Sequence, residues 1–337
     1  MSTLDMPSIR GPVAALPQEV YFEVTNRCNL LCETCPRTHN ELEPPADLDY
    51  ERMVEIADEL PVIRRALLHG VGEPLLNPEL PRMVAYFAGR GAHVVFNTNG
   101  ILLDKRRGDA VSAAGLSELR VSFDAATPET FKVVRGADVL PKILRNVAAF
   151  TKRRAEVGGD GPSVSIWATA LQENLHELPD LIRLSADLGV FRVHLQRLVF
   201  NGTGLAVAEQ SVFRDLSLRQ EEILAACRDA AAQVGVDLGG SGGTDGDGAF
   251  GGGAMDELAW QGCRRPWKVL YVTAQGTVLP CCMAPFATTD IPAISLGNVA
   301  EGVGNVWNGA AMRNFRTRHQ TADPPVPCAP CGSQWSL

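Results

Sequence analysis

Residues 19–37 read EVYFEVTNRCNLLCETCPR, a β-rich run followed at once by three cysteines. The run Glu19–Thr25 predicts a strand, and the loop after it carries Cys28, Cys32 and Cys35. Ribbon-type zinc sites usually use cysteine pairs two residues apart, so the three-residue first gap is unusual for zinc. A 4Fe–4S cluster takes one thiolate per iron, so three local thiolates would leave one iron open to a substrate or cofactor. This loop therefore favours an iron–sulfur cluster, with a zinc site or a chance grouping as the alternatives.

Strand-like and helix-like segments alternate after this loop. The expected further strands are Ala66–His69, Ala92–Asn97, Glu118–Phe123, Ser163–Ala170 and Val190–Val199. The expected helices are Leu48–Leu60, a segment opened by Asn77 and Pro78, Leu103–Ala114, Asp138–Val157, Leu178–Leu188 and Leu218–Val236. Such alternation implies right-handed βαβ units and a parallel sheet. Six units are fewer than the eight of a closed barrel, so we expect an α/β fold with a partial (β/α)6 barrel and reactive groups at the carboxyl ends of its strands.

The composition changes in the last third of the chain. Residues 239–254 are rich in glycine, and the segment after them holds five of the nine cysteines. Two β-rich runs flank Gln275 and Gly276, which predicts a hairpin, and a helix is expected through Met312 and Phe315. We divide the chain into an N-terminal lead (1–18), the partial barrel (19–236), a glycine-rich linker (237–260) and a small C-terminal hairpin-plus-helix domain (261–337).

The C-terminal domain offers a second set of thiolates, namely Cys263, Cys281, Cys328 and Cys331. Four is the full complement of a closed 4Fe–4S cluster, and a structural zinc site is the alternative. Cys227 lies on an apolar helical stripe, which indicates a buried core residue. Cys282 adjoins a ligand, and three roles are open to it: packing against the cluster, replacing Cys281, or donating a hydrogen atom.

The charge and the apolar pattern exclude several classes of protein. The chain has 31 Lys and Arg against 39 Asp and Glu, a net charge of −8, which argues against a nucleic-acid partner. No apolar run approaches bilayer length, and no signal-like segment opens the chain. We therefore expect a cytoplasmic protein with no membrane partner, in which disulfides are disfavoured.

Further motifs follow the cysteine loop at the predicted strand ends. They are Gly72-Glu73-Pro74 preceded by Gly70 and Val71, Asn97-Thr98-Asn99-Gly100, Ser122-Phe123-Asp124, and Arg135. In this order the motifs resemble those of the radical S-adenosylmethionine (SAM) superfamily, over about residues 20–200, with Val71 replacing a glycine and Thr34 replacing a common aromatic residue. The C-terminal domain resembles the SPASM/Twitch auxiliary-cluster module, in its shorter form with one cluster.

The resemblance implies two 4Fe–4S clusters and a bound SAM. Cys28, Cys32 and Cys35 would hold the cluster that SAM chelates, and the second set would hold the auxiliary cluster. Glu73 would accept a hydrogen bond from the SAM amine, Gly70 and Gly72 would let the backbone approach closely, and Ser122 and Asp124 would bind the ribose. The full set implied for SAM is Gly70, Gly72, Glu73, Pro74, Asn97, Ser122, Asp124, Arg135 and Gln196.

The activity implied by this resemblance is reductive cleavage of SAM to a 5′-deoxyadenosyl radical, which abstracts a hydrogen atom from a substrate. The pattern resembles that of 2-deoxy-scyllo-inosamine dehydrogenase and related sugar dehydrogenases and epimerases. Peptide-maturing relatives usually carry a leader-binding domain before the barrel, whereas the first strand here begins at residue 19. We therefore expect oxidation or epimerisation of a carbohydrate-like small molecule (a sugar, aminocyclitol, aminoglycoside or nucleoside) in natural-product biosynthesis, with a flavodoxin- or ferredoxin-type electron donor. The alternatives are a peptide-modifying maturase and a non-enzymatic iron–sulfur or zinc redox sensor.

Overall fold

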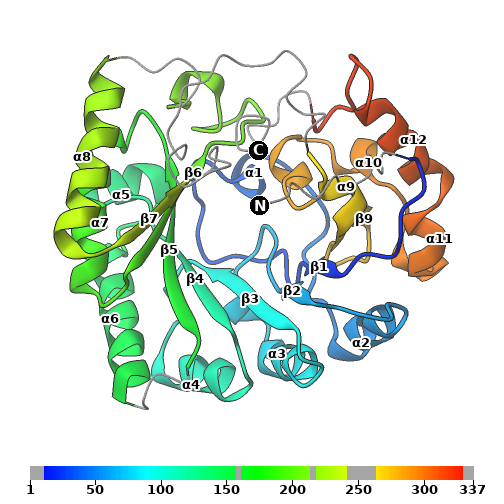
Figure 1. The fold of residues 1–337 in the computed structure, drawn as a ribbon, viewed down its shortest axis with the longest axis horizontal. Helices are drawn as coiled ribbons and strands as arrows, with labels where there is room; N and C mark the ends of the chain where they lie inside the picture. Colours follow the sequence, from blue (N-terminus) through cyan, green and yellow to red (C-terminus); the bar gives the residue numbers. More distant parts are fainter. Residues whose placement is uncertain (1–10, 157–160, 213–217, 241–262, 329–337) are drawn as a thin grey trace, which may run out of the picture.

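The computed structural model describes residues 11–156, 161–212, 218–240 and 263–328. Its centre is a nine-stranded sheet in the order β7-β6-β5-β4-β3-β2-β1-β8-β9. The sheet curves around a central space without closing, and the longer helices cover its outer side (Figure 1). The expected α/β partial barrel is confirmed.

The first seven strands run parallel to their neighbours. They are β1 Glu19–Phe22, β2 Arg65–Leu67, β3 His93–Thr98, β4 Glu118–Ser122, β5 Ser163–Ala170, β6 Arg192–Arg197 and β7 Asp237–Gly240. All six predicted strands are present, and β5 has the predicted bounds. The seventh strand lies where the linker was predicted to begin, because its sequence DLGG looks like a flexible segment while its backbone pairs with β6. The rest of that predicted linker lies outside the described residues.

The helices connect the strands on the outer side of the sheet. The longer ones are α2 Tyr50–Asp58, α3 Leu80–Ala88, α4 Lys105–Ala113, α5 Pro128–Arg135, α6 Leu140–Glu156, α7 Leu178–Asp187 and α8 Leu218–Val234. Side-chain caps fix several starts: Asp49 accepts from the backbone of Arg52 and Thr127 from that of Thr130, which satisfies amides that the helix leaves unpaired. The helix α5 is not among the helices expected from the sequence, which gave only the motif residue Arg135 in this segment.

Side chains alternate between the two faces of each strand, as a period of two requires. On β4, Leu119 and Val121 belong to the hydrophobic core under the helices, whereas Arg120 and Ser122 line a cavity on the inner side. The inner side of this barrel is therefore polar. The core also contains Cys227, which has no exposed surface, so its predicted place in the core is confirmed.

The C-terminal region joins the same sheet. The predicted hairpin is present as β8 Val269–Val272 and β9 Val278–Leu279, and β8 pairs parallel with β1. Short helices surround it: α9 Arg265–Lys268, α10 Ile291–Ile294, α11 Val303–Trp307 and α12 Ala310–His319. The N-terminal lead packs here too, since the indole of Trp307 donates to the carbonyl of Ala15 at 2.8 Å. None of the helices in the described part of the chain combines the length and apolar character needed to cross a bilayer.

Candidate active site

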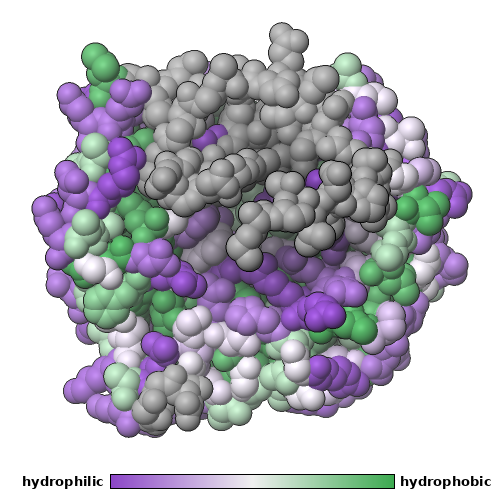
Figure 2. Space-filling view, viewed as in Figure 1, coloured by the Kyte–Doolittle hydropathy of each residue, from purple (hydrophilic) through white to green (hydrophobic). Residues whose placement is uncertain are grey.

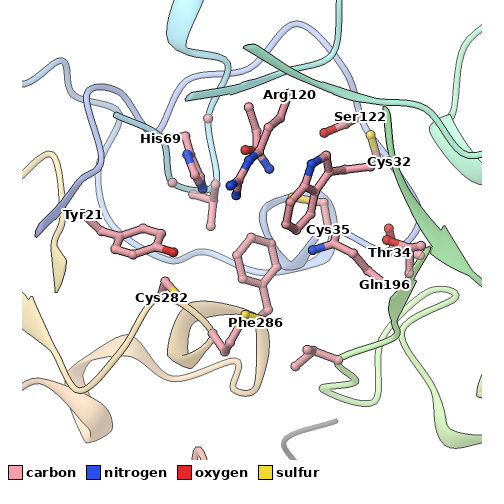
Figure 3. A pocket seen from close by; sticks show the side chains of 18 of the residues that line it. Tyr21, Cys32, Thr34, Cys35, His69, Arg120, Ser122, Gln196, Cys282 and Phe286 are labelled. Atoms are coloured by element: carbon pink, nitrogen blue, oxygen red, sulfur yellow. The ribbon is translucent and has the colours of Figure 1, made fainter. Parts of the chain in front are cut away.

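A cavity of about 570 Å³ lies inside the barrel, against the cysteine loop and the carboxyl ends of the strands (Figure 3). Of the residues predicted for the site, those that line it are Cys28, Cys32, Cys35, Gly70, Gly72, Glu73, Asn97, Ser122, Asp124, Arg135, Gln196 and Cys282. Pro74 does not line the cavity; it is buried and begins a short 3-10 helix, Pro74–Leu76. Figure 2 shows mainly hydrophilic residues in the hollowed centre of the same face, below the part drawn in grey.

The cysteine loop is a tight turn held from both sides. The amide of Cys35 donates to the carbonyl of Cys32 at 3.0 Å, and the hydroxyl of Thr38 donates to the same carbonyl at 2.8 Å. All three thiols are free, and burial raises the pKa of Cys35 to about 12. Such a thiol stays protonated until it binds a metal centre, which displaces its proton. The loop thus presents three thiols to one space, which fits a cluster site.

The spacing of the cysteines argues against a single zinc ion. Zinc–sulfur bonds of about 2.3 Å bring the sulfurs of one site close together. Among the described residues, no three cysteines have sulfurs that all lie within 4.8 Å of one another. Three thiols on one loop with wider spacing suit a four-iron cluster, which is larger than one ion. This observation favours the iron–sulfur prediction for the first loop.

Glu73 is buried between the ends of β2 and β3. One carboxylate oxygen accepts from the amide of Leu75 at 3.1 Å and the hydroxyl of Thr98 at 2.8 Å, and the other accepts from the amide of Asn99 at 2.7 Å. Burial raises its pKa. Glu73 therefore holds two strand ends together at the cavity wall, a role that the sequence analysis did not assign to it.

The two glycines of this segment are required by the protein's own packing. A side chain at Gly70 would place its Cβ 2.2 Å from the carboxylate of Glu23, and one at Gly72 would place it 2.1 Å from the carbonyl of Thr25. Both distances are far below van der Waals contact. The glycines thus let the loop after β2 lie directly against the end of β1, which carries the cysteine loop. The sequence analysis assigned them only to the approach of a ligand.

Asp124 and Arg135 form a buried ion pair beside the cysteine loop. The carboxylate lies 2.5 Å from Arg135 Nε and accepts from the amide of Thr169 at 2.8 Å. Arg135 Nη1 lies 3.7 Å from the sulfur of Cys32. Burial alone would lower the pKa of Arg135, but Asp124 and Cys32 outweigh it and raise that pKa. Both Asp124 oxygens have protein partners, so Asp124 positions Arg135, and its predicted contact with the ribose stays a prediction.

Several polar atoms face the cavity without a protein partner. Among the described residues, Asn97 Oδ1 and His69 Nδ1 are buried and lack a hydrogen bond. Buried polar atoms are normally paired, so unpaired ones at a cavity indicate a ligand. Ser122, Thr34 and Gln196 lie around the same space (Figure 3).

The sequence analysis missed part of the cavity wall. Tyr21, His69, Arg120 and Trp167 also line it. The signal was present in the sequence, because in EVYFEVT and ELRVSFD polar or aromatic residues alternate with apolar ones, which marks the inner side of each strand.

Of the second cysteine set, Cys263, Cys281 and Cys328 belong to the described part of the chain, and Cys331 lies outside it. Cys281 and Cys282 pack against a small core that contains Tyr271. Cys282 faces the cavity beside Tyr21 (Figure 3), and burial together with Cys282 raises the pKa of Tyr21. The C-terminal region therefore contributes directly to the cavity wall.

Comparisons with known proteins match both parts of the chain. A model described as "Radical SAM superfamily" matches residues 22–195, and one described as "Iron-sulfur cluster-binding domain" (SPASM) matches residues 263–332. A tungsten-containing aldehyde ferredoxin oxidoreductase cofactor-modifying protein of Pyrococcus furiosus is 31% identical over 174 residues, 51% of this chain and 49% of that protein. A PqqA peptide cyclase of Gluconobacter oxydans is 26% identical over 331 residues, 94% of this chain and 82% of that protein.

The solved structures agree on the fold. Streptococcus suis SuiB bound to SAM superposes with a TM-score of 0.65 at 15% identity, covering 89% of this chain and 68% of SuiB.

The chain spans about half the length of two curated relatives that it matches, 49% and 48%. The resemblance to sugar dehydrogenases and epimerases is not confirmed by these comparisons.

The radical SAM match covers more than half of the chain and coincides with the strands that surround the cavity. A domain of this kind takes SAM and a 4Fe–4S cluster, and a SPASM domain carries auxiliary iron–sulfur chemistry. The three thiols of the first loop and the unpaired atoms of the cavity fit these groups. The chain belongs to the radical SAM superfamily and carries a C-terminal SPASM domain.

Proposed function

We propose that this chain is a radical SAM enzyme that modifies a peptide. The observation that carries the proposal is the extent of its similarity to PqqA peptide cyclases. The enzyme of Gluconobacter oxydans aligns with 94% of this chain and that of Streptomyces rochei with 95%, through the barrel and the SPASM domain alike. The matches named as heme synthases cover only 56–61% of this chain. A peptide substrate is therefore better supported than the carbohydrate-like substrate favoured by the sequence analysis.

A solved relative with this fold supports the same proposal. SuiB has been crystallised with its precursor peptide SuiA, and that complex superposes on this chain with a TM-score of 0.63. SuiB is only 15% identical, so the likeness concerns the fold. A protein that shares this fold therefore binds a peptide, although the match covers only 66% of its chain.

Each cysteine set has a proposed role. Cys28, Cys32 and Cys35 hold the cluster to which SAM binds, and Cys263, Cys281, Cys328 and Cys331 hold an auxiliary cluster. When bound, SAM and its cluster supply the abstraction of a hydrogen atom from the substrate. An electron donor of the flavodoxin or ferredoxin type would reduce the cluster.

The chain's own residues position these groups. Asn97, Ser122 and Gln196 offer polar atoms to SAM at the strand ends, while Glu73 fixes the ends of β2 and β3. Arg135, held by Asp124, lies against Cys32 and places a positive charge beside the anionic cluster. The wall from β1 to β6 keeps the reacting atoms away from bulk water.

The substrate class can be tested without knowing the substrate. Cells of the source organism are grown in deuterated water, and their soluble extract is separated by size. Each fraction is mixed, without oxygen, with the reconstituted enzyme, unlabelled SAM and dithionite. We expect deuterated 5′-deoxyadenosine, measured by mass spectrometry, from the peptide-sized fraction, and we expect protease treatment of that fraction to abolish the label.

Controls separate this outcome from background. A Cys32→Ser variant, which lacks a cluster ligand, must give no deuterated product from any fraction. Label that comes from the smallest metabolites and survives the protease would overturn the peptide proposal and restore the carbohydrate-like substrate. An intact-cluster protein that releases no 5′-deoxyadenosine would favour the redox-sensor alternative.

A further inference from the structure

The cavity has a second region, formed by residues on the inner side of its strands next to those predicted for SAM. Arg120 precedes Ser122 by two residues on β4 and so lies about 7 Å further down the strand. We call this region the floor and define it by Tyr21, Arg65, His69, Arg120 and Trp167, all of which line the cavity. None of these residues belongs to the set predicted for SAM.

Arg120 is held rigidly in the floor. Its Nη2 lies 3.0 Å from Glu118, and its guanidinium lies over the ring of Trp167, 4.0 Å from the centroid. The indole of Trp167 donates to Ser165 at 3.0 Å, and Ser165 donates to Glu118 at 2.9 Å. His194 stacks on Trp167 with centroids 4.3 Å apart. This closed network fixes the guanidinium before any ligand arrives, so binding loses little side-chain entropy.

Two polar atoms of the floor remain unsatisfied. Arg120 is nine-tenths buried, and its Nε has no hydrogen-bond partner among the described residues. The same holds for the buried Nδ1 of His69. Figure 3 shows both side chains directed into the same part of the cavity. The unpaired Nε–H of Arg120 is a costly buried donor, so it anticipates an acceptor atom from a ligand. Nδ1 of the neutral His69 can donate beside it in one of its two tautomers.

The local charge indicates the kind of acceptor. Burial, together with Arg120 and Arg65, lowers the pKa of His69 to about 3, so its imidazole is neutral. Arg65 and Arg120 have counter-charges in Glu19, at 3.5 Å, and Glu118, at 3.0 Å. Even so, the charged groups that act on His69 are both arginines. The two guanidinium groups therefore lie near this point of the cavity, where they can bind an anionic oxygen.

We propose that the floor binds an oxyanion of the substrate, namely the carboxylate of an acidic side chain, through Arg120 with His69 and Arg65 beside it. The placement of that carboxylate on a peptide rests on the proposed function; the oxyanion site itself does not. A guanidinium offers the paired donors that suit a carboxylate. Arg120 pairs with Asn97, and Trp167 pairs with Ser122, on neighbouring strands. An acidic side chain bound there would therefore lie next to the residues expected to bind SAM.

Calorimetry on the full chain tests the site without turnover. The protein carries reconstituted clusters and saturating SAM, and the probes are N-acetylglutamate N-methylamide, the isosteric glutamine compound, and inorganic phosphate. We expect the glutamate compound to bind about tenfold more tightly than the glutamine compound. Arg120→Gln should abolish this preference and leave the affinity for SAM unchanged. Arg192→Gln, an exposed arginine on β6, should retain the preference.

A second variant changes the preference in the opposite direction. Glu118→Gln removes the counter-charge of Arg120, so the glutamate compound should bind at least as tightly as to the parent protein. This arm keeps the test decisive if Arg120→Gln fails to fold. Three results would overturn the proposal. They are equal binding of the glutamate and glutamine compounds, no binding of either compound up to about 50 mM, and a preference for the glutamate compound that survives Arg120→Gln.

The remaining outcomes identify the source of the oxyanion. If phosphate alone binds in an Arg120-dependent way, the acidic side chain is overturned and a phosphorylated substrate takes its place. If the glutamate preference holds while the deuterium label comes from small metabolites, the peptide function fails and the oxyanion site stands.

Discussion

Asp124 shows how one buried side chain can link the sheet to the cysteine loop. It is 1% exposed, and its carboxylate joins the backbone of β5, at Thr169, to the guanidinium of Arg135, which lies against Cys32. The motif Ser122-Phe123-Asp124 was correctly expected at a strand end. Which of its residues faces a ligand could not be predicted, because that depends on Arg135, which arrives from a helix the sequence analysis did not expect.

Replacing Asp124 by asparagine should destabilise the protein strongly. The change keeps the shape of the side chain but leaves Arg135 buried without a counter-charge, which costs on the order of 3 kcal/mol of unfolding free energy. Urea denaturation of the full chain measures this loss. Asp180→Asn is the matched control, because its ion pair with Arg183 is exposed, and it should change stability by less than about 1 kcal/mol. Equal effects of the two changes would refute the positioning role of Asp124.

At the scale of elements, the sequence predicted the strands of the barrel better than the starts of several helices and the edge strand β7. The β-branched run of β5 has no competing pattern, and its predicted bounds agree with the structure. Helix starts were placed early, as at Leu48, because a buried apolar residue precedes the cap Asp49. The strand β7 was missed because DLGG has almost no side chains to form a pattern. Its stability comes from backbone pairing with β6, which composition does not reveal.

The parts of the site that are marked by sequence motifs could be predicted. The cysteine loop and the residues at four strand ends converge on one cavity, as expected of parallel strands. The floor was not predicted, since it depends on which face of each strand points inward. Cys282 was a candidate for the site, but its place beside Tyr21 was not predictable, because it depends on the pairing of β8 with β1, far apart in the sequence.

The loop after β2 gives the element-scale prediction. Gly72→Ala places a Cβ 2.1 Å from the backbone carbonyl of Thr25, so the start of the cysteine loop must move. We expect a loss of about 1–3 kcal/mol in unfolding free energy and a lower iron content per chain after reconstitution. Gly304→Ala is the control, because a Cβ there meets nothing within 4 Å. Normal iron content and normal SAM binding in Gly72→Ala would show that the loop tolerates the shift.

At the scale of the whole molecule, the two family matches contribute strands to one sheet. The hairpin β8–β9 continues the barrel sheet through four residue pairs between β8 and β1. The N-terminal lead closes over the C-terminal helices: Trp267 donates to the carbonyl of Gly11, and Trp307 donates to that of Ala15, each at 2.8 Å. Both connections cross the boundary at which the sequence analysis separated a barrel from a C-terminal domain.

Hydrogen exchange measures whether the C-terminal strands open together with the barrel strands. If the sheet opens as one unit, the amides of β8 should exchange with an opening free energy within about 1 kcal/mol of those of β1. The strand β7 is the internal control, because within the described residues it pairs with β6 alone, at the other edge of the sheet, and should exchange faster. Exchange of β8 as fast as that of β7 would mean that the C-terminal region opens on its own. In that case the wall contributed by Tyr271 and Cys282 would be a movable part of the cavity rather than a fixed one.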